Sequence, residues 1–284
     1  MEIDLIGNGI WSRKIYSLLD SNEHQVKIIP AREFLSSDFS KFLDNGGDKL
    51  LWIATRPEIQ FEIMKKASEY KGKILLEKPI IFSNYYPIDV IIDFYINLKN
   101  INNIYLSKPW VYSIIWNEFK IICDEKKIKD IQIWRSGKAA HDFIHPSLDW
   151  LCHDIFLLLD LFDSELRFSK KSPIVKENIF TFKAKIDGIN VEMTGGKNNL
   201  DKIAMWKVTM RDETEFMIDF INRTITHFNQ MNMKKQLKFS VDDPLKSMLF
   251  YFLHQENGTS KTYLNSVLNA QANILNRITT FEKN

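Results

Sequence analysis

Three ionisable residues, Lys78, Asp149 and His153, have types and spacing that suit acid–base chemistry at an alcohol or carbonyl oxygen. Such chemistry needs a group of near-neutral pKa within hydrogen-bond reach of the reacting oxygen. His153 suits that role because imidazole titrates in this range. Asp149 lies four residues earlier, so on a helix both side chains share one face, and the carboxylate could orient the imidazole or bind a second hydroxyl. Lys78 would stabilise alkoxide character or hand on the proton.

A structural role is the alternative for the Asp149 and His153 pair. Polar groups inside an apolar helix must find partners, and both a satisfied core histidine and a ligand pocket provide them. The apolar neighbours of the pair are Leu148, Trp150, Leu151, Ile155, Leu157 and Leu158.

A metal site is a further alternative, because His141, His145, Asp149 and His153 recur every four residues. Pro146 argues against one continuous helix, since proline clashes with the preceding helical turn. We therefore expect the helix to begin at Pro146, leaving the first two histidines in the approach loop, where His145 could border a substrate pocket. No metal site is predicted.

A glycine turn follows the first predicted strand. Its sequence is Gly7-Asn8-Gly9-Ile10-Trp11-Ser12, and a helical pattern follows, with Ile10, Ile15, Leu18 and Leu19 on one side. A strand, a glycine turn and a helix N-terminus together bind the pyrophosphate of a dinucleotide through backbone N–H groups and the helix dipole. The cofactor contacts predicted in this turn are Gly7, Gly9, Ile10, Trp11 and Ser12, although Ser12 replaces the usual third glycine.

The residues after the second predicted strand bear on whether the cofactor is NAD or NADP. The local sequence is Pro30-Ala31-Arg32-Glu33. Arg32 could meet a 2′-phosphate and favours NADP, whereas Glu33 could reach the ribose of NAD. Arg32 as a solvated surface charge is the alternative.

The order of predicted elements places the turn in an α/β domain. Apolar strands separated by amphipathic helices, with one helix ending at Gly72, indicate a parallel sheet covered on both faces, which we assign to a Rossmann dinucleotide-binding domain over residues 1–124. Residues 125–284 form a second, α+β domain with an open, mostly antiparallel sheet, including a hairpin at Asp187-Gly188. The first-domain strands are predicted over residues 2–6, 25–29, 49–55 and 73–77.

The stretch "KILLEKPI" ends a predicted buried strand with Glu77, Lys78 and Pro79. Ligands bind at the carboxyl ends of parallel strands, so Glu77 and Lys78 are expected at that edge of the sheet. An exposed ion pair at a strand end is the alternative for these two residues.

The ordered set of motifs resembles the Gfo/Idh/MocA oxidoreductases over nearly the whole chain. The set comprises Gly7-x-Gly9, "IATRPEIQ", "GKILLEKPI" and Asp149-x-x-x-His153. The resemblance implies a Rossmann domain and an open sheet domain, an NAD(P) cofactor, and catalytic roles for Lys78, Asp149 and His153. It further implies cofactor contacts for Thr55, Arg56, Pro57, Glu77 and Lys78.

Two residues depart from the family's pattern. Leu151 stands where the D-x-G-x-H segment usually has glycine, and Gln60 stands where a polar histidine is common. The segment "SKPWVYSIIW" after the last Rossmann strand could offer Lys108, Trp110 and Tyr112 to a polyol. Its aromatic residues could instead form interdomain core.

These features predict an NAD(P)-dependent oxidoreductase acting on a secondary alcohol or ketone of a sugar, nucleotide-linked sugar or related polyol, in a setting such as glycan biosynthesis. One alternative is an enzyme of the same family that reduces a C=N or conjugated double bond. A non-catalytic dinucleotide-sensing regulator is another.

Bulk properties constrain the partners and the compartment. Lysine and arginine total 38 against 36 acidic residues, without a basic block, so no nucleic-acid partner is expected. Cys123 and Cys152 are expected to be buried free thiols in a cytoplasmic protein, without signal peptide or membrane span. We expect a homodimer or homotetramer, formed through a broad apolar sheet face left uncovered by helices.

Overall fold

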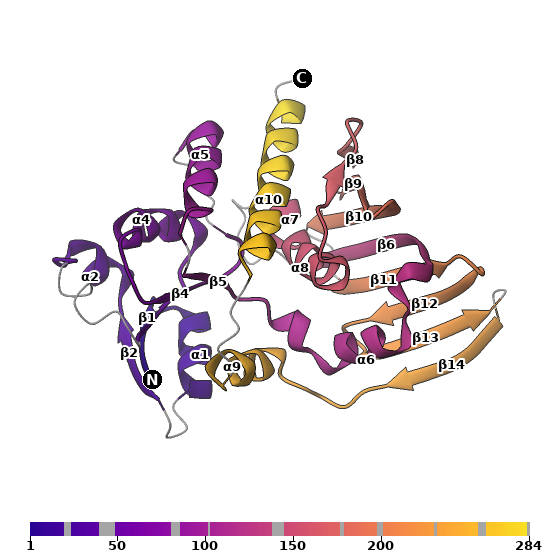
Figure 1. The fold of residues 1–284 in the computed structure, drawn as a ribbon, viewed down its shortest axis with the longest axis horizontal. Helices are drawn as coiled ribbons and strands as arrows, with labels where there is room; N and C mark the ends of the chain where they lie inside the picture. Colours follow the sequence, from indigo (N-terminus) through magenta and orange to yellow (C-terminus); the bar gives the residue numbers. More distant parts are fainter. Residues whose placement is uncertain are drawn as a thin grey trace. The chain divides into compact units, whose positions relative to one another are not determined.

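The computed structural model divides the chain into two compact units. The first comprises Met1–Ser107 and Gln255–Leu268, and the second comprises Lys108–His254 and Asn269–Asn284. Helix α10 (Lys261–Glu282) contributes residues to both. Figure 1 labels the elements along the chain. The structure describes residues 1–19, 24–39, 49–80, 86–101, 103–137, 145–176, 179–197, 201–229, 232–254 and 260–282.

The first unit is built on a parallel five-stranded sheet with the order β2-β1-β3-β4-β5. After its first residue β3 is buried throughout, as expected for a strand covered on both faces. This is the predicted Rossmann arrangement. The strands are β1 (Glu2–Ile6), β2 (Gln25–Ile29), β3 (Lys49–Ile53), β4 (Lys73–Leu76) and β5 (Ile104–Leu106), and the helices described between them are α1 (Ile10–Leu19), α2 (Ala31–Ser36), α4 (Pro57–Ala67) and α5 (Ile88–Leu98).

Helix α4 is shorter than its sequence pattern predicts. It ends at Ala67 rather than at Gly72, because the next residues form a turn with hydrogen bonds of its own. The Tyr70 amide donates to the carbonyl of Ala67, and the Tyr70 hydroxyl donates to the carbonyl of Lys49.

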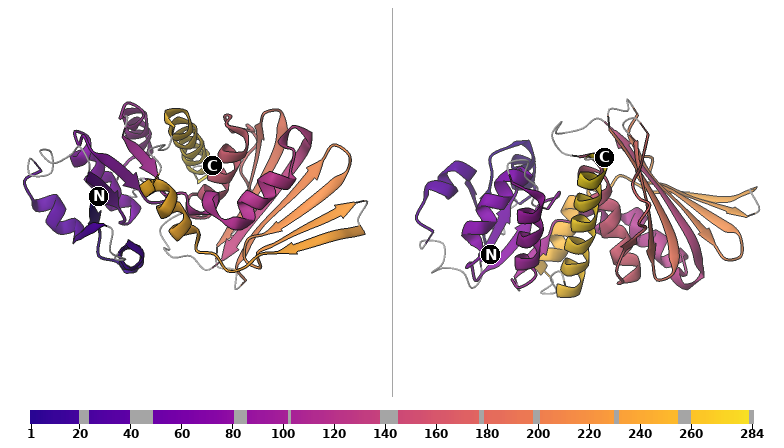
Figure 2. Two further views of the ribbon diagram at one scale, coloured as in Figure 1. Left: turned by 60° about the horizontal axis from the view of Figure 1, so that its bottom comes forward. Right: turned by 90° about the horizontal axis from the view of Figure 1, so that it is seen from above.

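The second unit contains a nine-stranded sheet with the order β14-β13-β12-β11-β6-β10-β9-β7, while β8 pairs with β9 (Figure 1). Strand β10 runs parallel to β6, and the other pairings are antiparallel, as the prediction of a mostly antiparallel sheet requires. Figure 2 shows the twist of this sheet from two further sides. Its strands are β6 (Ile128–Gly137), β7 (Arg167–Phe168), β8 (Ile174–Lys176), β9 (Ile179–Ile186), β10 (Ile189–Lys197), β11 (Ile203–Met210), β12 (Thr214–Asp219), β13 (Thr224–Asn229) and β14 (Asn232–Lys238).

The predicted hairpin joins β9 to β10. Asp187 and Gly188 have φ angles of 51° and 80°, the left-handed conformation that a two-residue primed turn requires. The hairpin sets the pairing of Ile186 with Ile189, and with it the alternation of buried and exposed residues along both strands.

An aromatic core in the second unit includes residues of helix α6 (Ile114–Ile122). The indole of Trp116 on α6 packs against Trp206 with ring centroids 5.2 Å apart, and Trp116 Nε1 donates to Asp160 over 2.8 Å. Phe119 packs edge-on against Phe216. The helical elements of this unit are η1 (Pro109–Tyr112), α6 (Ile114–Ile122), η2 (Glu125–Lys127), α7 (Pro146–Asp149), α8 (Leu151–Phe162) and α9 (Pro244–His254).

The other face of the large sheet is polar over much of its area, which corrects the expectation of a broad apolar face. Lys183 pairs with Glu192 across β9 and β10, and Lys207 pairs with Glu215 across β11 and β12. These residues alternate along their strands with the buried apolar ones, so cross-strand ion pairs line this face.

Both cysteines, Cys123 and Cys152, are buried free thiols, as predicted. Burial raises the pKa of the Cys123 thiol to about 12. Across the part of the chain that the structure describes, no helix has both the length and the apolar character needed to span a membrane.

Candidate active site

The glycine turn has the geometry that its sequence predicts. Gly7 has a φ of 130°, and a Cβ there would lie 2.5 Å from the Ala54 carbonyl oxygen, so both the backbone conformation and the space require glycine. A Cβ on Gly9 would meet no atom within 4 Å. The turn is therefore closed on its Gly7 side and open at Gly9, immediately before the first turn of α1.

Ser12 takes the place of the usual third glycine without loosening this turn. Its side chain is buried, and its Oγ donates to the carbonyl of Ala54 over 2.9 Å. The hydroxyl thus occupies the space beside Gly7 and links α1 to the end of β3. Because the glycine turn is intact and opens at a helix N-terminus, its residues fit a dinucleotide pyrophosphate.

Ile10 does not belong to the buried face of α1, contrary to the sequence pattern. Its side chain is 92% exposed, whereas Ile15 and Leu19 are buried. It is the first residue of the helix, where the chain has just left the sheet, so no later turn covers it. Trp11 is also 40% exposed, and both side chains are therefore accessible beside the glycine turn.

Arg32 and Glu33 are both exposed in the first turn of α2, directly after β2. Either side chain can reach solvent at this end of the strand.

The loop after β3 begins α4 with Pro57 at its first position. Thr55 is partly buried, and the exposed Arg56 pairs with Glu58 over 3.3 Å. Gln60, which replaces the family's common histidine, is buried, and its Nε2 donates to the carbonyls of Thr55 and Glu77 over 3.1 and 3.0 Å. Gln60 therefore ties this loop to the end of β4.

Glu77 is buried in the first unit, with 4% of its surface exposed. Its carboxylate accepts a 3.0 Å hydrogen bond from Trp52 Nε1. Burial raises the pKa of the Glu77 carboxyl, and the polar side chains of Ser107, Trp11 and Trp52 together with the charge of Lys78 oppose the rise. Glu77 was predicted at this edge of the sheet, where its carboxylate is hydrogen-bonded to Trp52. Its contact with a cofactor stays a prediction.

Lys78 follows at the carboxyl edge of the parallel sheet and is partly exposed. The peptide between Lys78 and Pro79 is cis. Pro79 and Ile80 are buried, and the carbonyl of Ile80 accepts a hydrogen bond from the Tyr95 hydroxyl. The segment around Lys78 is thus held on both sides while the lysine itself reaches the surface of the unit.

In the second unit, Asp149 and His153 lie on two short consecutive helices and not on one. Helix α7 begins at Pro146, as predicted, and ends at Asp149, and α8 begins at Leu151. Trp150 between them keeps a right-handed helical conformation (φ −92°, ψ −49°), so the chain continues in a helical course. Asp149 is buried and His153 is partly exposed.

The family's missing glycine has a local explanation. Leu151 is fully buried against Gly195 of β10, where a Cβ would lie 3.4 Å from Leu151 Cγ. A glycine on the strand therefore makes room for the larger side chain on the helix.

Sequence reasoning missed a buried ion pair beside this helix. Arg135 on β6 donates to both oxygens of Asp154 over 2.6 and 2.7 Å, and Trp206 Nε1 donates to Asp154 over 2.8 Å. The available signal was Arg135 itself, which continues the inward alternation of Ile131 and Ile133. The pair fixes α8, and with it the residue next to Asp154, His153, against the sheet.

His145 precedes α7, and its ring packs edge-on against Phe180 at 4.1 Å between centroids. His141 lies outside the described residues. Among the residues that are described, no group of three or more His, Cys, Asp or Glu side chains has the arrangement of a metal site.

Lys108, Trp110 and Tyr112 open the second unit. Burial lowers the pKa of Lys108, as does the charge of Lys120, while Asp160 opposes the change. Trp110 is partly exposed, and its ring packs edge-on against that of Phe220 at 5.6 Å. Burial raises the pKa of Tyr112, whose ring lies 5.4 Å from that of Tyr251.

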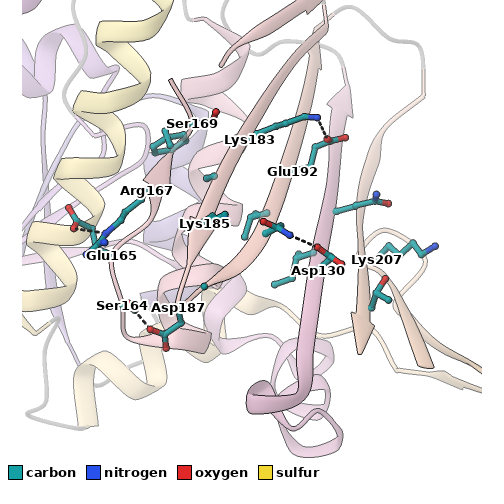
Figure 3. Close-up of a pocket in the computed structure, with 18 residues that line it drawn as sticks. Asp130, Ser164, Glu165, Arg167, Ser169, Lys183, Lys185, Asp187, Glu192 and Lys207 are labelled. Atoms are coloured by element: carbon teal, nitrogen blue, oxygen red, sulfur yellow. Dashed lines mark hydrogen bonds and ion pairs between the residues drawn. The ribbon is translucent and has the colours of Figure 1, made fainter. Parts of the chain in front are cut away.

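A hollow of about 950 Å³ lies on the polar face of the large sheet. None of the predicted catalytic or cofactor-binding residues lines it. Figure 3 shows Lys183 directed toward Glu192 and Arg167 directed toward Glu165. Four acidic and four basic residues line the hollow, so neither sign of charge is in excess there.

Comparison with protein-family models finds no match for this chain, and comparison with curated protein sequences finds none either. Solved structures are similar over almost the whole chain. UDP-N-acetylglucosamine 3-dehydrogenase GnnA from Acidithiobacillus ferrooxidans has a TM-score of 0.71 at 14% identity, covering 98% of this chain and 97% of its own. A Gfo/Idh/MocA family oxidoreductase from Vibrio cholerae has a TM-score of 0.72 at 11% identity, with both chains fully covered.

A third similar structure is biliverdin reductase from Synechocystis, in complex with biliverdin and NADP+. Its TM-score is 0.67 at 11% identity, covering 95% of this chain and 98% of its own. The order of a parallel α/β unit and a large mixed sheet is common to these proteins. The chain has the fold of the Gfo/Idh/MocA-type oxidoreductases.

Proposed function

We propose that the protein is an NAD(P)-dependent oxidoreductase that acts on a secondary alcohol or ketone. The observation that carries this proposal is the combination, in one unit, of a glycine turn open at Gly9 and a lysine at the carboxyl edge of the same parallel sheet. Ligands of doubly wound α/β domains bind at that edge.

The residues of the glycine turn would hold the pyrophosphate, and the exposed Ile10 and Trp11 would lie against the dinucleotide. Thr55, Arg56 and Pro57 would contact it from the loop after β3. Nicotinamide, when bound, accepts or supplies a hydride. Arg32 favours NADP, because a guanidinium can bind a 2′-phosphate through two hydrogen bonds.

Side chains of the protein would stabilise the reacting oxygen and transfer the proton. Lys78 would stabilise negative charge on the reacting oxygen, and His153 would accept or return the proton. Asp149 would orient the imidazole or bind a neighbouring hydroxyl. We propose that these three residues act on the same substrate.

A sugar, nucleotide-linked sugar or polyol is the substrate class that we propose. The similarity to a UDP-N-acetylglucosamine 3-dehydrogenase supports it. We propose Lys108, Trp110, Tyr112 and His145 as the contacts with its hydroxyl groups, and all four are partly exposed.

Reduction of a conjugated double bond is the second candidate function, and the similarity to a biliverdin reductase favours it. This chemistry needs less of the Asp149 and His153 pair. A His153→Asn variant that keeps full turnover would support it, whereas loss of turnover would support the alcohol chemistry.

We further propose a cytoplasmic homodimer or homotetramer. Partly exposed apolar side chains on the otherwise polar sheet face support the assembly, namely Trp134, Met205, Met217 and Phe228. Light scattering at micromolar concentration should give a multiple of the 33.5 kDa chain mass, and a monomer would contradict it.

Titration of the purified protein into NADPH and NADH tests the main proposal. Binding should change the fluorescence of the reduced nicotinamide. Lys78→Ala should reduce turnover far more than dinucleotide affinity. Binding without turnover on any substrate, unchanged by replacing Lys78, would point instead to a dinucleotide-sensing regulator.

A further inference from the structure

Lys66 on α4 makes three hydrogen bonds to the backbone at the end of another helix. Its ammonium nitrogen donates to the carbonyls of Phe34, Leu35 and Ser37, over 3.1, 2.8 and 2.5 Å. A lysine ammonium has three N–H groups, so these bonds use all of its donors. The side chain of Lys66 therefore connects α4 to α2, within the first unit (Figure 1).

The carbonyls that Lys66 binds lie at the C-terminal end of α2. Carbonyls at this end of a helix have no partner within the helix and form the negative end of its dipole, so a cation there is stabilising. Helix α2 has only six residues, and a helix of this length does not form stably by itself. It is held instead by the fully buried Phe34 and by Lys66, whose ammonium lies 5.9 Å from the centre of the Phe34 ring.

The first turn of α2 carries Arg32 and Glu33, whose side chains are both exposed. They follow β2 at the carboxyl edge of the parallel sheet. In dinucleotide-binding domains, side chains at this place distinguish NAD from NADP, because an acidic residue binds the ribose 2′-hydroxyl and an arginine binds the 2′-phosphate. Pro30 precedes the helix, and among the described residues no side chain caps this end of α2. The placement of Arg32 and Glu33 therefore depends on how firmly the far end of the helix is held.

We propose that Lys66 is a positioning residue for cofactor selectivity, which holds α2 so that Arg32 and Glu33 face the ribose of the bound dinucleotide. This inference rests on the proposed dinucleotide-dependent function. Selectivity here is the ratio of the dissociation constants for NADPH and NADH. The two side chains have opposite preferences, so the ratio depends on their placement. The glycine turn belongs to another segment, so the affinity common to both dinucleotides does not depend on Lys66.

Titration of NADPH and NADH into wild type and Lys66→Met tests the proposal without an enzymatic assay. Methionine keeps the apolar stem of the side chain and removes the ammonium. The ratio should move toward one by about fivefold, the effect of losing one hydrogen bond to the ribose or its phosphate, whichever dinucleotide the wild type prefers. An unchanged ratio, or a wild type that binds both dinucleotides equally, would overturn the proposal and leave the proposed function intact. Binding of neither dinucleotide to wild type would refute the proposed function.

Two control variants separate this effect from loss of stability or charge. Tyr70→Phe also removes a side-chain donor to a backbone carbonyl, that of Lys49 over 3.2 Å, but at the opposite end of β3. Lys65→Met removes the neighbouring charge on α4, where the exposed ammonium pairs with Glu62 over 3.7 Å. Both variants should keep the wild-type ratio. A change in either control as large as that in Lys66→Met would overturn the proposal.

A second set of variants tests whether Lys66 acts through α2. In Arg32→Ala/Glu33→Ala the ratio should approach one, and adding Lys66→Met should change it no further, because all three changes affect the same contact. A further change in the ratio would show that Lys66 acts elsewhere. If Lys66→Met does not fold, Lys66→Gln replaces it, since an amide keeps two of the three N–H donors. The ratio should again move toward one, and an unchanged ratio in Lys66→Gln would overturn the proposal.

Discussion

Ser12 Oγ donates a 2.9 Å hydrogen bond to the carbonyl of Ala54 at the position where dinucleotide-binding turns ordinarily have a third glycine. The hydroxyl also lies 2.7 Å from where a Cβ on Gly7 would be. Helix α1 and the end of β3 are thus connected by a hydrogen bond at the point where a glycine would only permit their close approach.

Replacing Ser12 tests whether its hydrogen bond to Ala54 stabilises the glycine turn. Ser12→Ala leaves the Ala54 carbonyl without its partner and should lower the free energy of unfolding by about 1 kcal/mol. Ser12→Leu should do far more damage, because the added carbons have no room beside Gly7. Urea unfolding of both variants measures the effect. Equal stability of wild type and Ser12→Leu would show that the turn is looser than described.

The Arg135 and Asp154 pair yields the largest stability prediction. Both side chains are almost completely buried, at 4% and 0% exposure, so Asp154→Asn leaves a buried guanidinium without its charge partner. The expected loss is about 3 to 5 kcal/mol by denaturant unfolding. The exposed pair of Lys129 and Glu213 is the matched control, and Lys129→Met should change stability very little. Similar losses of stability at both sites would contradict the conclusion that burial makes the pair of Arg135 and Asp154 the more important one.

Leu151 and Gly195 form a pair whose sizes are complementary. Gly195→Val places methyl groups into Leu151, and overpacking of this kind costs about 1 to 3 kcal/mol. Adding Leu151→Ala should restore part of the loss, although that change alone leaves a cavity. Thermal unfolding of both single variants and the double variant gives the coupling. Strictly additive losses would show that the two side chains do not meet.

Lys108 provides a prediction with a defined pH dependence. Burial lowers its pKa in the folded state below the ordinary 10.5, so folding with a charged Lys108 costs stability. That cost is present at neutral pH and disappears as the pH rises from the lowered value toward 10.5. Lys108→Met should therefore stabilise the protein near pH 7, and its advantage should shrink at high pH.

Lys120→Met is the control for Lys108. Lys120 donates to Asp160 over 2.8 Å, so its loss should lower stability at neutral pH. If Lys108 also binds substrate, Lys108→Met will raise the unfolding temperature and lower activity together. A Lys108→Met variant less stable than wild type at pH 7 would contradict the inferred burial cost.

Local patterns in the sequence were sufficient for several of the regular elements. Strand β6 follows from its alternation, the hairpin from Asp187-Gly188, and the start of α7 from Pro146, because each depends on neighbouring residues alone. The Gly7 and Gly9 turn was predictable for the same reason. The exposure of Ile10 was not, because periodicity cannot tell which turn of a helix extends past the sheet.

The features that the sequence did not predict depend on contacts between residues far apart in the chain. The burial of Glu77 depends on Trp52, 25 residues away, and Arg135 meets Asp154 only because β6 lies beneath α8. The sequence pattern of the large sheet also indicated an apolar outer face. Cross-strand register instead places Lys183 opposite Glu192 there, and register is set by the whole sheet rather than by one strand.

Dinucleotide titration of a Gly9→Asp variant tests the central claim most directly. A Cβ at Gly9 would meet no atom within 4 Å, so the variant should fold with an unchanged unfolding temperature. Its carboxylate would stand where the pyrophosphate is proposed to bind. Ser17→Asp, an exposed site further along α1, carries the same added charge and is the control. We predict saturable binding of NADPH or NADH to wild type and to Ser17→Asp, and at least a hundredfold weaker binding to Gly9→Asp, a loss of about 2.7 kcal/mol. Failure of the wild type to bind either dinucleotide, or equal affinity in all three proteins, would contradict the account.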